Sequence, residues 1–294
     1  MILRPSAPSF TPPPGLSAQR ALECPRPTPA LIRPPKFWLP TERRLIVSQH
    51  AAVALNNVET STPSDGSSAT HSGYTVSSGS DLILGVKVDW YRPNATASTL
   101  NSVTFNTSES LTQAVAANIL GPESDERYQS ELWYLLNPSV TTANIAFSWS
   151  NSIDDIGIFV FYLTEAAQQA PEATGSAGDT LEDEPFTIGI TTVTDGALVV
   201  GGGQMEPSSG ANDNMTPDGN TTEHADIEVN SQFDARAVLG SRLTASAGSG
   251  ALSWGFEDQT ECWAWSGVAA AFAPATGGGG GSALPIIHQQ EHGA

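Results

Sequence analysis

The chain has 294 residues, with 12 basic and 31 acidic side chains and a formal net charge of -19. This balance argues against nucleic-acid binding by the chain as a whole, because phosphate contact needs concentrated Lys and Arg. No run of about 18 apolar residues occurs, so no membrane-spanning helix is predicted. The 27 Gly and 21 Pro residues are inconsistent with a helical bundle.

The first 44 residues differ from the rest in charge and in proline content. They hold seven basic and two acidic side chains, a net charge of +5, whereas the remaining 250 residues carry -24. Eleven of the 21 prolines lie within the first 40 residues. Proline removes backbone donors and fixes φ, so this segment is expected to be extended, at about 3.1 Å per residue.

Two interpretations of this N-terminal arm remain open. One is a disordered tail. The other is an anchoring arm that lies along another subunit, with basic side chains against an acidic surface. The arm lacks an apolar stretch followed by a small-residue cleavage site, so it is not expected to be a secretory signal. The candidate anchor residues are Arg33, Pro34, Pro35, Lys36, Phe37, Trp38, Arg43 and Arg44.

Downstream of the arm, apolar and polar residues alternate with a period of two, which predicts β-strands. In 81–90, Leu and Val alternate with Asp81, Lys87 and Asp89, which favours a half-buried strand. The same alternation occurs in 144–149, 186–191 and 252–256, and an apolar series runs through 263–272. The run 156–163 is apolar on both faces, as in a central strand.

Turn-forming clusters separate these segments and predict about ten strands. The expected fold class is all-β: an antiparallel two-sheet sandwich, jelly-roll-like, with an extended N-terminal arm. The expected organisation is an arm at 1–44, one sandwich at 45–275 and a Gly-rich tail at 276–294.

Two polar segments, 165–184 and 203–226, are predicted to be long loops. Each is either a binding surface or a loop that extends into solvent without binding anything. Segment 203–226 is rich in oxygen donors, and calcium accepts such ligands in loose geometry. The EF-hand pattern nevertheless fails, because Ala225 stands where the bidentate Glu belongs. No metal site and no cofactor are therefore predicted.

For the remaining candidate sites, the functional interpretation competes with a purely structural role or with chance occurrence of the residue type. Asp154 and Asp155 supply paired carboxylates, but acids are abundant in this chain. Cys24 and Cys262 show no zinc spacing, and a disulfide between them is not signalled. The aromatic residues are candidates either for a sugar-stacking platform or for the core. They are Trp133, Tyr134, Trp254, Trp263 and Trp265.

Several segments, in this order, resemble a known family. They are SVTF (102–105), LWYLLNP (132–138), NIAFSW (144–149), GALVV (196–200) and WAWSGVAA (263–270). Together with the arm sequence LIRPPKFWLP (31–40), they resemble β-sandwich virion structural proteins of tailed bacteriophages and prophages. The resemblance covers roughly residues 30–275 and implies a capsid decoration or cement protein, a head fibre, or a tail component. It implies no catalytic or metal residue.

Three functions follow as hypotheses. The first is a virion structural protein, most consistent with capsid decoration, whose arm binds the major capsid protein or another scaffold subunit. It would be located in the virion, after assembly in the host bacterial cytoplasm. It is expected to be a homo-oligomer, with a trimer as one option, and not an enzyme. The second is a tail or head-fibre module that binds a receptor or a host surface glycan. The third is a polysaccharide hydrolase.

Overall fold

A computed structural model of the chain describes residues 51–93, 96–121, 126–180, 186–207, 214–230, 235–256 and 262–276. All sixteen regular elements in these ranges are β-strands, and all strand pairs are antiparallel. The same residues include no helix long and apolar enough to cross a membrane. The expected all-β antiparallel class is confirmed, with more strands than the ten predicted.

The strands fall into two consecutive groups. The first group is β1 (Ala54–Ser61), β2 (Gly66–Thr75), β3 (Ile83–Arg92), β4 (Leu100–Phe105), β5 (Glu109–Ser110), β6 (Thr112–Leu120), β7 (Arg127–Leu136) and β8 (Thr142–Thr164). The second group is β9 (Ala173–Asp179), β10 (Phe186–Thr192), β11 (Leu198–Pro207), β12 (Met215–Pro217), β13 (Thr222–Asn230), β14 (Ala235–Leu243), β15 (Gly248–Phe256) and β16 (Cys262–Phe272).

The first group forms one sheet that bends over itself along β8. The N-terminal part of β8 pairs with β2 and β4, whereas its C-terminal part pairs with β1 and β3. Asp155, near the change of partners, has a φ of 50°, a left-handed conformation that Asp tolerates better than most residues. We call the layer β5-β4-β8-β2 the first outer sheet and the layer β1-β8-β3-β7-β6 the first inner sheet.

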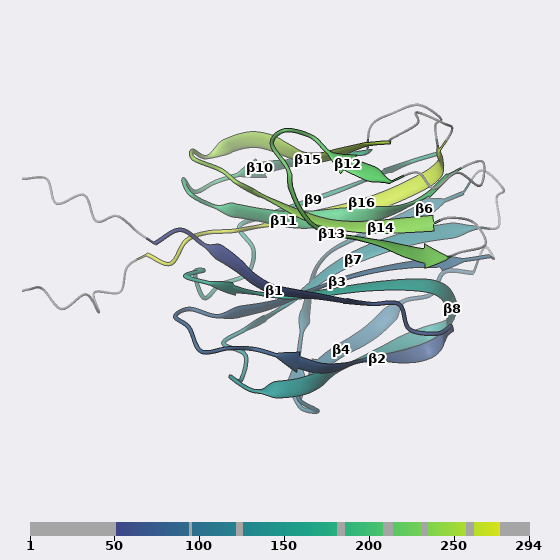
Figure 1. Ribbon diagram of the computed structural model, residues 1–294, viewed down its shortest axis with the longest axis horizontal. Coiled ribbons are helices and arrows are strands. Elements are labelled where there is room, and N and C mark those ends of the chain that lie inside the picture. Colours follow the sequence, from purple (N-terminus) through teal and green to yellow (C-terminus); the bar gives the residue numbers. More distant parts are fainter. Residues whose placement is uncertain are drawn as a thin grey trace, which may run out of the picture. The chain divides into compact units, whose positions relative to one another are not determined.

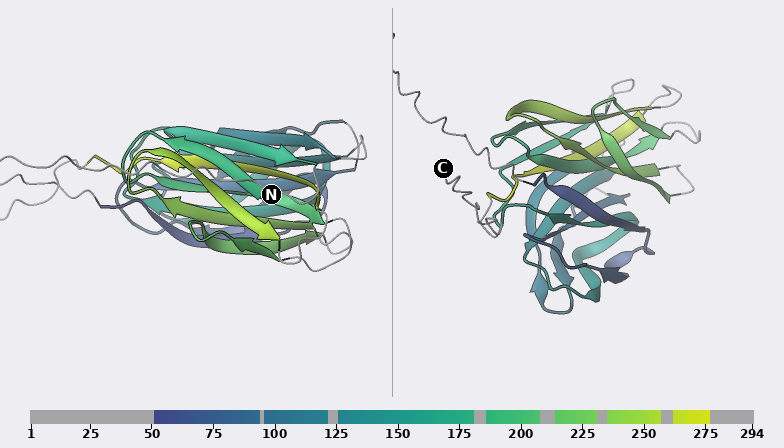
Figure 2. Two further views of the ribbon diagram at one scale, coloured as in Figure 1. Left: turned by 90° about the horizontal axis from the view of Figure 1, so that it is seen from above. Right: turned by 60° about the vertical axis from the view of Figure 1, so that its left-hand side comes forward.

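The second group forms two further layers. The second inner sheet has the order β13-β14-β11-β16-β9, and the second outer sheet has the order β10-β15-β12. Many neighbouring strands are not consecutive in the chain, so the connections cross over as they do in Greek-key and jelly-roll sandwiches. Figures 1 and 2 show the purple-to-teal strands of the first group on one side and the green-to-yellow strands of the second on the other.

Three apolar cores join these four layers. One lies within the first group and includes Trp90, Phe147 and Trp149. A second lies between the two inner sheets, where Phe159 and Phe161 of β8 face residues such as Leu239 of β14 and Phe272 of β16. The third lies within the second group and includes Phe186 and Trp254. The predicted sandwich is therefore present twice, stacked face to face.

This stacking changes the environment of β3. Its alternating pattern predicted one face in solvent, but every residue from Ile83 to Tyr91 is buried. Lys87 and Asp89 have no exposed surface, because the second inner sheet covers the polar face of the strand. The prediction of a half-buried strand is wrong. By contrast, the fully buried strand predicted at 156–163 is confirmed as the C-terminal part of β8, where only Tyr162 retains slight exposure.

Both predicted loops contain strands. Segment 165–184 contains β9, which pairs with β16 at the edge of the second inner sheet. Segment 203–226 contains the end of β11, all of β12 and the start of β13. Sequence reasoning missed these strands because their Gly, Ser and Thr residues lack the apolar alternation. The arm at 1–44 and nearly all of the tail at 276–294 lie outside the described residues.

Candidate functional site

The sequence-predicted anchor residues cannot be located in the fold. Arg33, Pro34, Pro35, Lys36, Phe37, Trp38, Arg43 and Arg44 all lie outside the described residues. The described part of the chain begins at Ala51. Ala51 and Ala52 line an apolar pocket of about 230 Å³ together with Pro274, close to the last described residue. Both described ends of the chain therefore meet at one end of the stack, on the left in Figure 1.

The aromatic residues considered for sugar stacking belong to the core. Trp254 is fully buried. The exposed fractions of Trp133 and Trp265 are 7% and 5%. Phe186 contacts both Trp254 and Trp265, with ring centroids 5.2 and 4.6 Å apart. A stacking platform needs an accessible ring face. The interpretation of these three tryptophans as a sugar platform is therefore wrong, and the side chain of Trp263 lies outside the described residues.

The oxygen-rich segment 203–226 does not gather its carboxylates in the part that the structure describes. Asp218 accepts hydrogen bonds from the backbone N–H of Asn220 at 3.2 Å and from the Thr221 hydroxyl at 2.7 Å, so its carboxylate stabilises a turn. Asp226 forms an ion pair with Arg236 at 2.9 Å. No group of three or more Asp, Glu, His or Cys residues suited to a metal ion occurs among the described residues.

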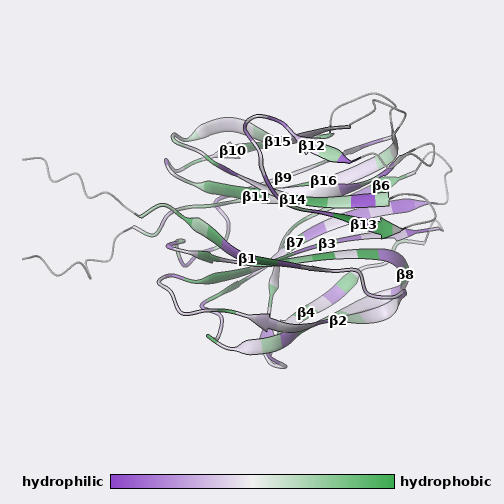
Figure 3. Ribbon diagram, in the orientation of Figure 1, coloured by the Kyte–Doolittle hydropathy of each residue, from purple (hydrophilic) through white to green (hydrophobic). Residues whose placement is uncertain are grey.

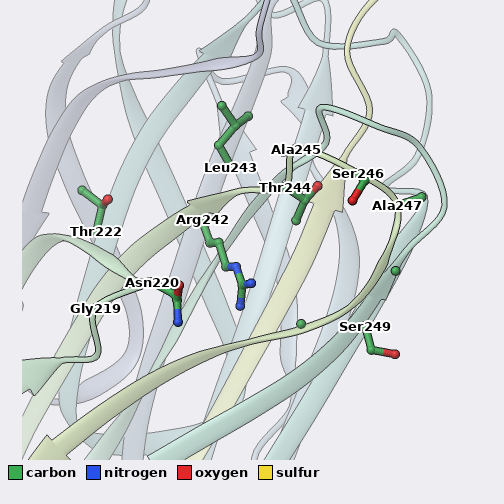
Figure 4. Close-up of a pocket in the computed structure, with 12 residues that line it drawn as sticks. Gly219, Asn220, Thr222, Arg242, Leu243, Thr244, Ala245, Ser246, Ala247 and Ser249 are labelled. Atoms are coloured by element: carbon green, nitrogen blue, oxygen red, sulfur yellow. The ribbon is translucent and has the colours of Figure 1, made fainter.

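A larger and more polar pocket lies beside the apolar one (Figure 4). Its volume is about 590 Å³, within the range typical of small-ligand sites. It lies between the end of β14, the turn before β13 and the start of β15. The lining residues are Gly219, Asn220, Thr222, Arg242, Leu243, Thr244, Ala245, Ser246, Ala247, Gly248, Ser249 and Gly250.

Arg242 supplies the charge of this polar pocket. Strand alternation directs its side chain towards the second outer sheet, where Nη1 donates a hydrogen bond to the Ala251 carbonyl at 3.1 Å. A Cβ added at Gly250 would lie 3.3 Å from the same nitrogen, so the glycine leaves room for the guanidinium. Among the described residues, Arg242 forms no ion pair within 4.0 Å. Sequence reasoning missed this residue, because no motif marks it.

A Ser–His–Glu cluster joins β1 to β2. The Ser61 hydroxyl lies 2.9 Å from Nδ1 of His71, and Nε2 of His71 lies 3.4 Å from Glu59. These residue types occur in hydrolytic triads, but there Nε2 faces the nucleophile and Nδ1 faces the acid, the reverse of this arrangement. Since β1 belongs to the first inner sheet and β2 to the first outer sheet, we assign the cluster a structural role between layers. Asp154 and Asp155, the other sequence-derived acids, lie at the bend of β8.

Polar side chains also lie between the two inner sheets. Lys87 forms an ion pair with Asp89, and the Lys87 ammonium lies 4.6 Å from the centre of the Phe159 ring. Asp89 accepts a hydrogen bond from the Ser130 hydroxyl at 2.6 Å, and Ser130 also contacts Ser266 of β16. Burial lowers the pKa of Lys87 and raises that of Asp89, and each partner opposes the other's shift. Figure 3 shows hydrophilic stretches within strands of the inner layers, among them β7.

A second polar group between the inner sheets includes two tyrosines. The Tyr128 hydroxyl donates to Glu206, and the Tyr91 hydroxyl donates to Glu126 at 2.9 Å. Burial and the neighbouring carboxylates raise the pKa of both tyrosines. Gln204 of β11 donates to the Trp90 and Gln129 carbonyls at 2.7 and 3.0 Å. These hydrogen bonds satisfy buried polar groups and fix the register of the two halves.

The fold and these sites define an all-β, antiparallel sandwich protein whose described part contains an open polar pocket lined by an arginine. No protein-family model matches the chain. No curated protein matches it either. Among solved structures, the C-terminal domain of the AgI/II polypeptide BspA from Streptococcus agalactiae shows a slight likeness, with 9% identity and a TM-score of 0.17. The likeness covers 65% of this chain and 76% of that domain, and it is too slight to support a statement about fold or function.

Proposed function

We propose that the protein is a structural component of a bacteriophage virion, most consistent with a capsid decoration or cement protein. In this proposal the basic N-terminal arm binds the major capsid protein or another scaffold subunit, and the acidic stack of sheets is displayed on the particle. The observation that carries it is the separation of charge, +5 in residues 1–44 against -24 in the remainder. The resemblance of the strand segments to virion sandwich proteins points to the same class.

The position of the chain ends supports attachment from one side. Ala51, the first described residue, lines the same pocket as Pro274. An arm that binds only the assembled lattice adds its binding free energy to the stability of that lattice. Many symmetric copies multiply the effect through high effective concentration.

The test compares incorporation into particles. The four basic anchor residues Arg33, Lys36, Arg43 and Arg44 are changed together to Gln, and virions of the phage or prophage that encodes the chain are purified. We expect the unchanged protein in the particles, detected by mass spectrometry, and strong loss of the variant. A matched control changes the same positions conservatively, Arg33, Arg43 and Arg44 to Lys and Lys36 to Arg, which keeps the charge of the arm and should leave incorporation unchanged.

Two outcomes contradict the proposal. One is the absence of the unchanged protein from purified particles. The other is normal incorporation of the arm variant. Copy number per particle then separates a capsid location from a tail location, because a shell protein is present in many more copies than a tail component. A location at the tail would favour the alternative function, a receptor-binding or carbohydrate-binding module.

A further inference from the structure

The polar pocket differs in its chemistry from the apolar pocket beside it. Its lining consists of hydroxyl, amide and exposed backbone groups around one cation, whereas the adjacent pocket at the chain ends is apolar. The body outside the arm holds 5 basic residues. Of these, Lys87 and Arg236 are in ion pairs with Asp89 and Asp226. Arg242 is the basic side chain that lines the pocket.

The fold holds the guanidinium of Arg242 in place with one hydrogen bond and leaves other N–H donors for a ligand. One of its five N–H donors is used by the Ala251 carbonyl at 3.1 Å. Figure 4 shows the side chain extending from β14 towards β15, with Asn220 beside it. A planar guanidinium with two free donors side by side matches a carboxylate in a bidentate arrangement.

Two carboxylates beside the pocket accept hydrogen bonds from backbone groups of its walls. Asp218 accepts from the backbone N–H of Asn220 at 3.2 Å. Asp195 accepts from the backbone N–H of Ala247 at 2.7 Å. Both therefore stabilise the turns that form the pocket walls. Neither of these carboxylates forms an ion pair with Arg242, and Glu223 of β13, which follows the lining residue Thr222, forms none with it either.

The remaining lining groups suit a ligand with many hydroxyls. Thr222, Ser246 and Ser249 contribute hydroxyls that both donate and accept. The Thr244 hydroxyl donates to the Ala197 carbonyl at 2.8 Å and keeps only its acceptor capacity. A Cβ added at Gly219 or Gly248 would meet nothing within 4 Å, so open space lies beside these two backbones. The volume of about 590 Å³ accommodates one or two sugar rings.

We propose that the pocket around Arg242 binds a carboxylate-bearing saccharide, with the guanidinium holding the carboxylate and the Ser, Thr and Asn side chains holding the hydroxyls. This inference does not depend on the anchoring function, because it concerns residues outside the arm. The net charge of the body repels anions at long range. Salt screens exposed charges beyond about 10 Å, so contacts within the pocket govern binding at physiological ionic strength.

The test uses the full chain and a panel of uronic-acid and sialic-acid oligosaccharides, each paired with its neutral counterpart. Digalacturonate and galactobiose form one such pair. Binding is measured by isothermal titration calorimetry and ligand-observed NMR. We expect at least one acidic saccharide to bind roughly tenfold more tightly than its neutral counterpart, in line with a charge-assisted hydrogen-bonded pair. Arg242→Gln should remove that preference.

Two further variants separate binding from folding. Asn220→Asp adds a carboxylate to the lining of the pocket without removing the hydrogen bond from Arg242 to Ala251, and it should also weaken acidic-sugar binding. Arg127→Gln removes the same charge as Arg242→Gln but lies outside the pocket, and it should bind as the unchanged protein does. Thermal unfolding of each variant checks that the sheets are intact.

Three results would overturn the proposal. The first is that no acidic saccharide binds in preference to its neutral counterpart. The second is that folded Arg242→Gln and Asn220→Asp variants retain the preference. The third is that inorganic sulfate displaces the saccharide completely while galactobiose has no effect, which would show an anion site without sugar recognition.

Discussion

At the scale of single residues, the ion pair of Lys87 and Asp89 places two opposite charges in the interior of the protein. Both side chains are completely buried between the inner sheets. Desolvation of two charges is costly, and their attraction offsets it only when other hydrogen bonds satisfy the remaining atoms. The Ser130 hydroxyl, at 2.6 Å from Asp89, supplies one such bond.

Removing one partner of this pair should destabilise the protein strongly. We expect Lys87→Met to lower the free energy of unfolding by about 3–5 kcal/mol, because it leaves Asp89 buried and uncompensated. The double variant Lys87→Met/Asp89→Leu should recover much of that loss, since no buried charge remains. Urea unfolding of the three proteins measures both effects. Equal destabilisation by the single and double variants would contradict this account.

Glu131 of β7 gives a pH-dependent contribution to stability. It is 4% exposed, and burial raises its pKa from 4.5 to about 7, although the indole of Trp133 donates to it at 2.7 Å. Between these two pH values the folded protein holds a proton that the unfolded chain has released. The stability contributed by this group is therefore full below about pH 4.5 and is lost as the pH rises through 7.

The variant Glu131→Gln isolates this contribution. Its side-chain oxygen keeps the hydrogen bond from Trp133 but does not titrate. Between acidic and mildly alkaline pH, the unchanged protein should lose about 3 kcal/mol of stability relative to the variant. Urea unfolding at a series of pH values measures the difference. Parallel pH profiles for the two proteins would exclude a buried, titrating Glu131.

At the scale of strands, glycines let the outer and inner sheets approach. Gly203 of β11 pairs with Gly267 of β16, and the ring of Phe186 from β10 lies over both. A Cβ at Gly203 would overlap the Ser266 carbonyl and this ring. Because neither of the two paired glycines has a side chain, the buried Phe186 ring of the other sheet packs directly against their backbone.

Gly203→Ala should therefore cost about 3 kcal/mol through overpacking. Gly189→Ala is the matched control on β10, because a Cβ there meets nothing within 4 Å. It should change stability by no more than about 0.5 kcal/mol. Thermal and urea unfolding of both variants measure the effect. A similar cost at the two positions would show that the close packing around Gly203 does not decide it.

At the scale of the whole described stack, the core between the inner sheets joins the two halves of the chain. Phe159, Phe161 and Leu163 of β8 are fully buried in this core. The inner face of either half would be a large exposed apolar surface if the other half were absent. The two sandwiches are therefore interdependent.

Expressing 51–168 without the second half should give an aggregating protein, whereas 51–276 should unfold in one cooperative transition. Calorimetry tests the second expectation through the ratio of calorimetric to van't Hoff enthalpy, which is near one for a two-state protein. Light scattering tests the first. A soluble, monomeric and cooperatively folded 51–168 would show that the core between the halves is not required.

The sequence predicted strands wherever apolar alternation was strong. Ile188 and Leu252 mark strands that the structure confirms. It failed where strand residues are small and polar, as in β9, because Gly, Ser and Thr there carry no period-two signal. It also gave no indication of the pocket, since Arg242, Asn220 and Ser249 come from separate parts of the chain that only tertiary packing brings together.

By itself, the sequence determined the all-β class, the approximate strand positions and the separation of charge between the arm and the body. The tertiary structure decided how many layers form and which polar residues are buried. Alternation reports that one side of a strand is apolar, but not which sheet covers the other side. Lys87 and Asp89 were expected in solvent for that reason, and the second inner sheet places them in the interior.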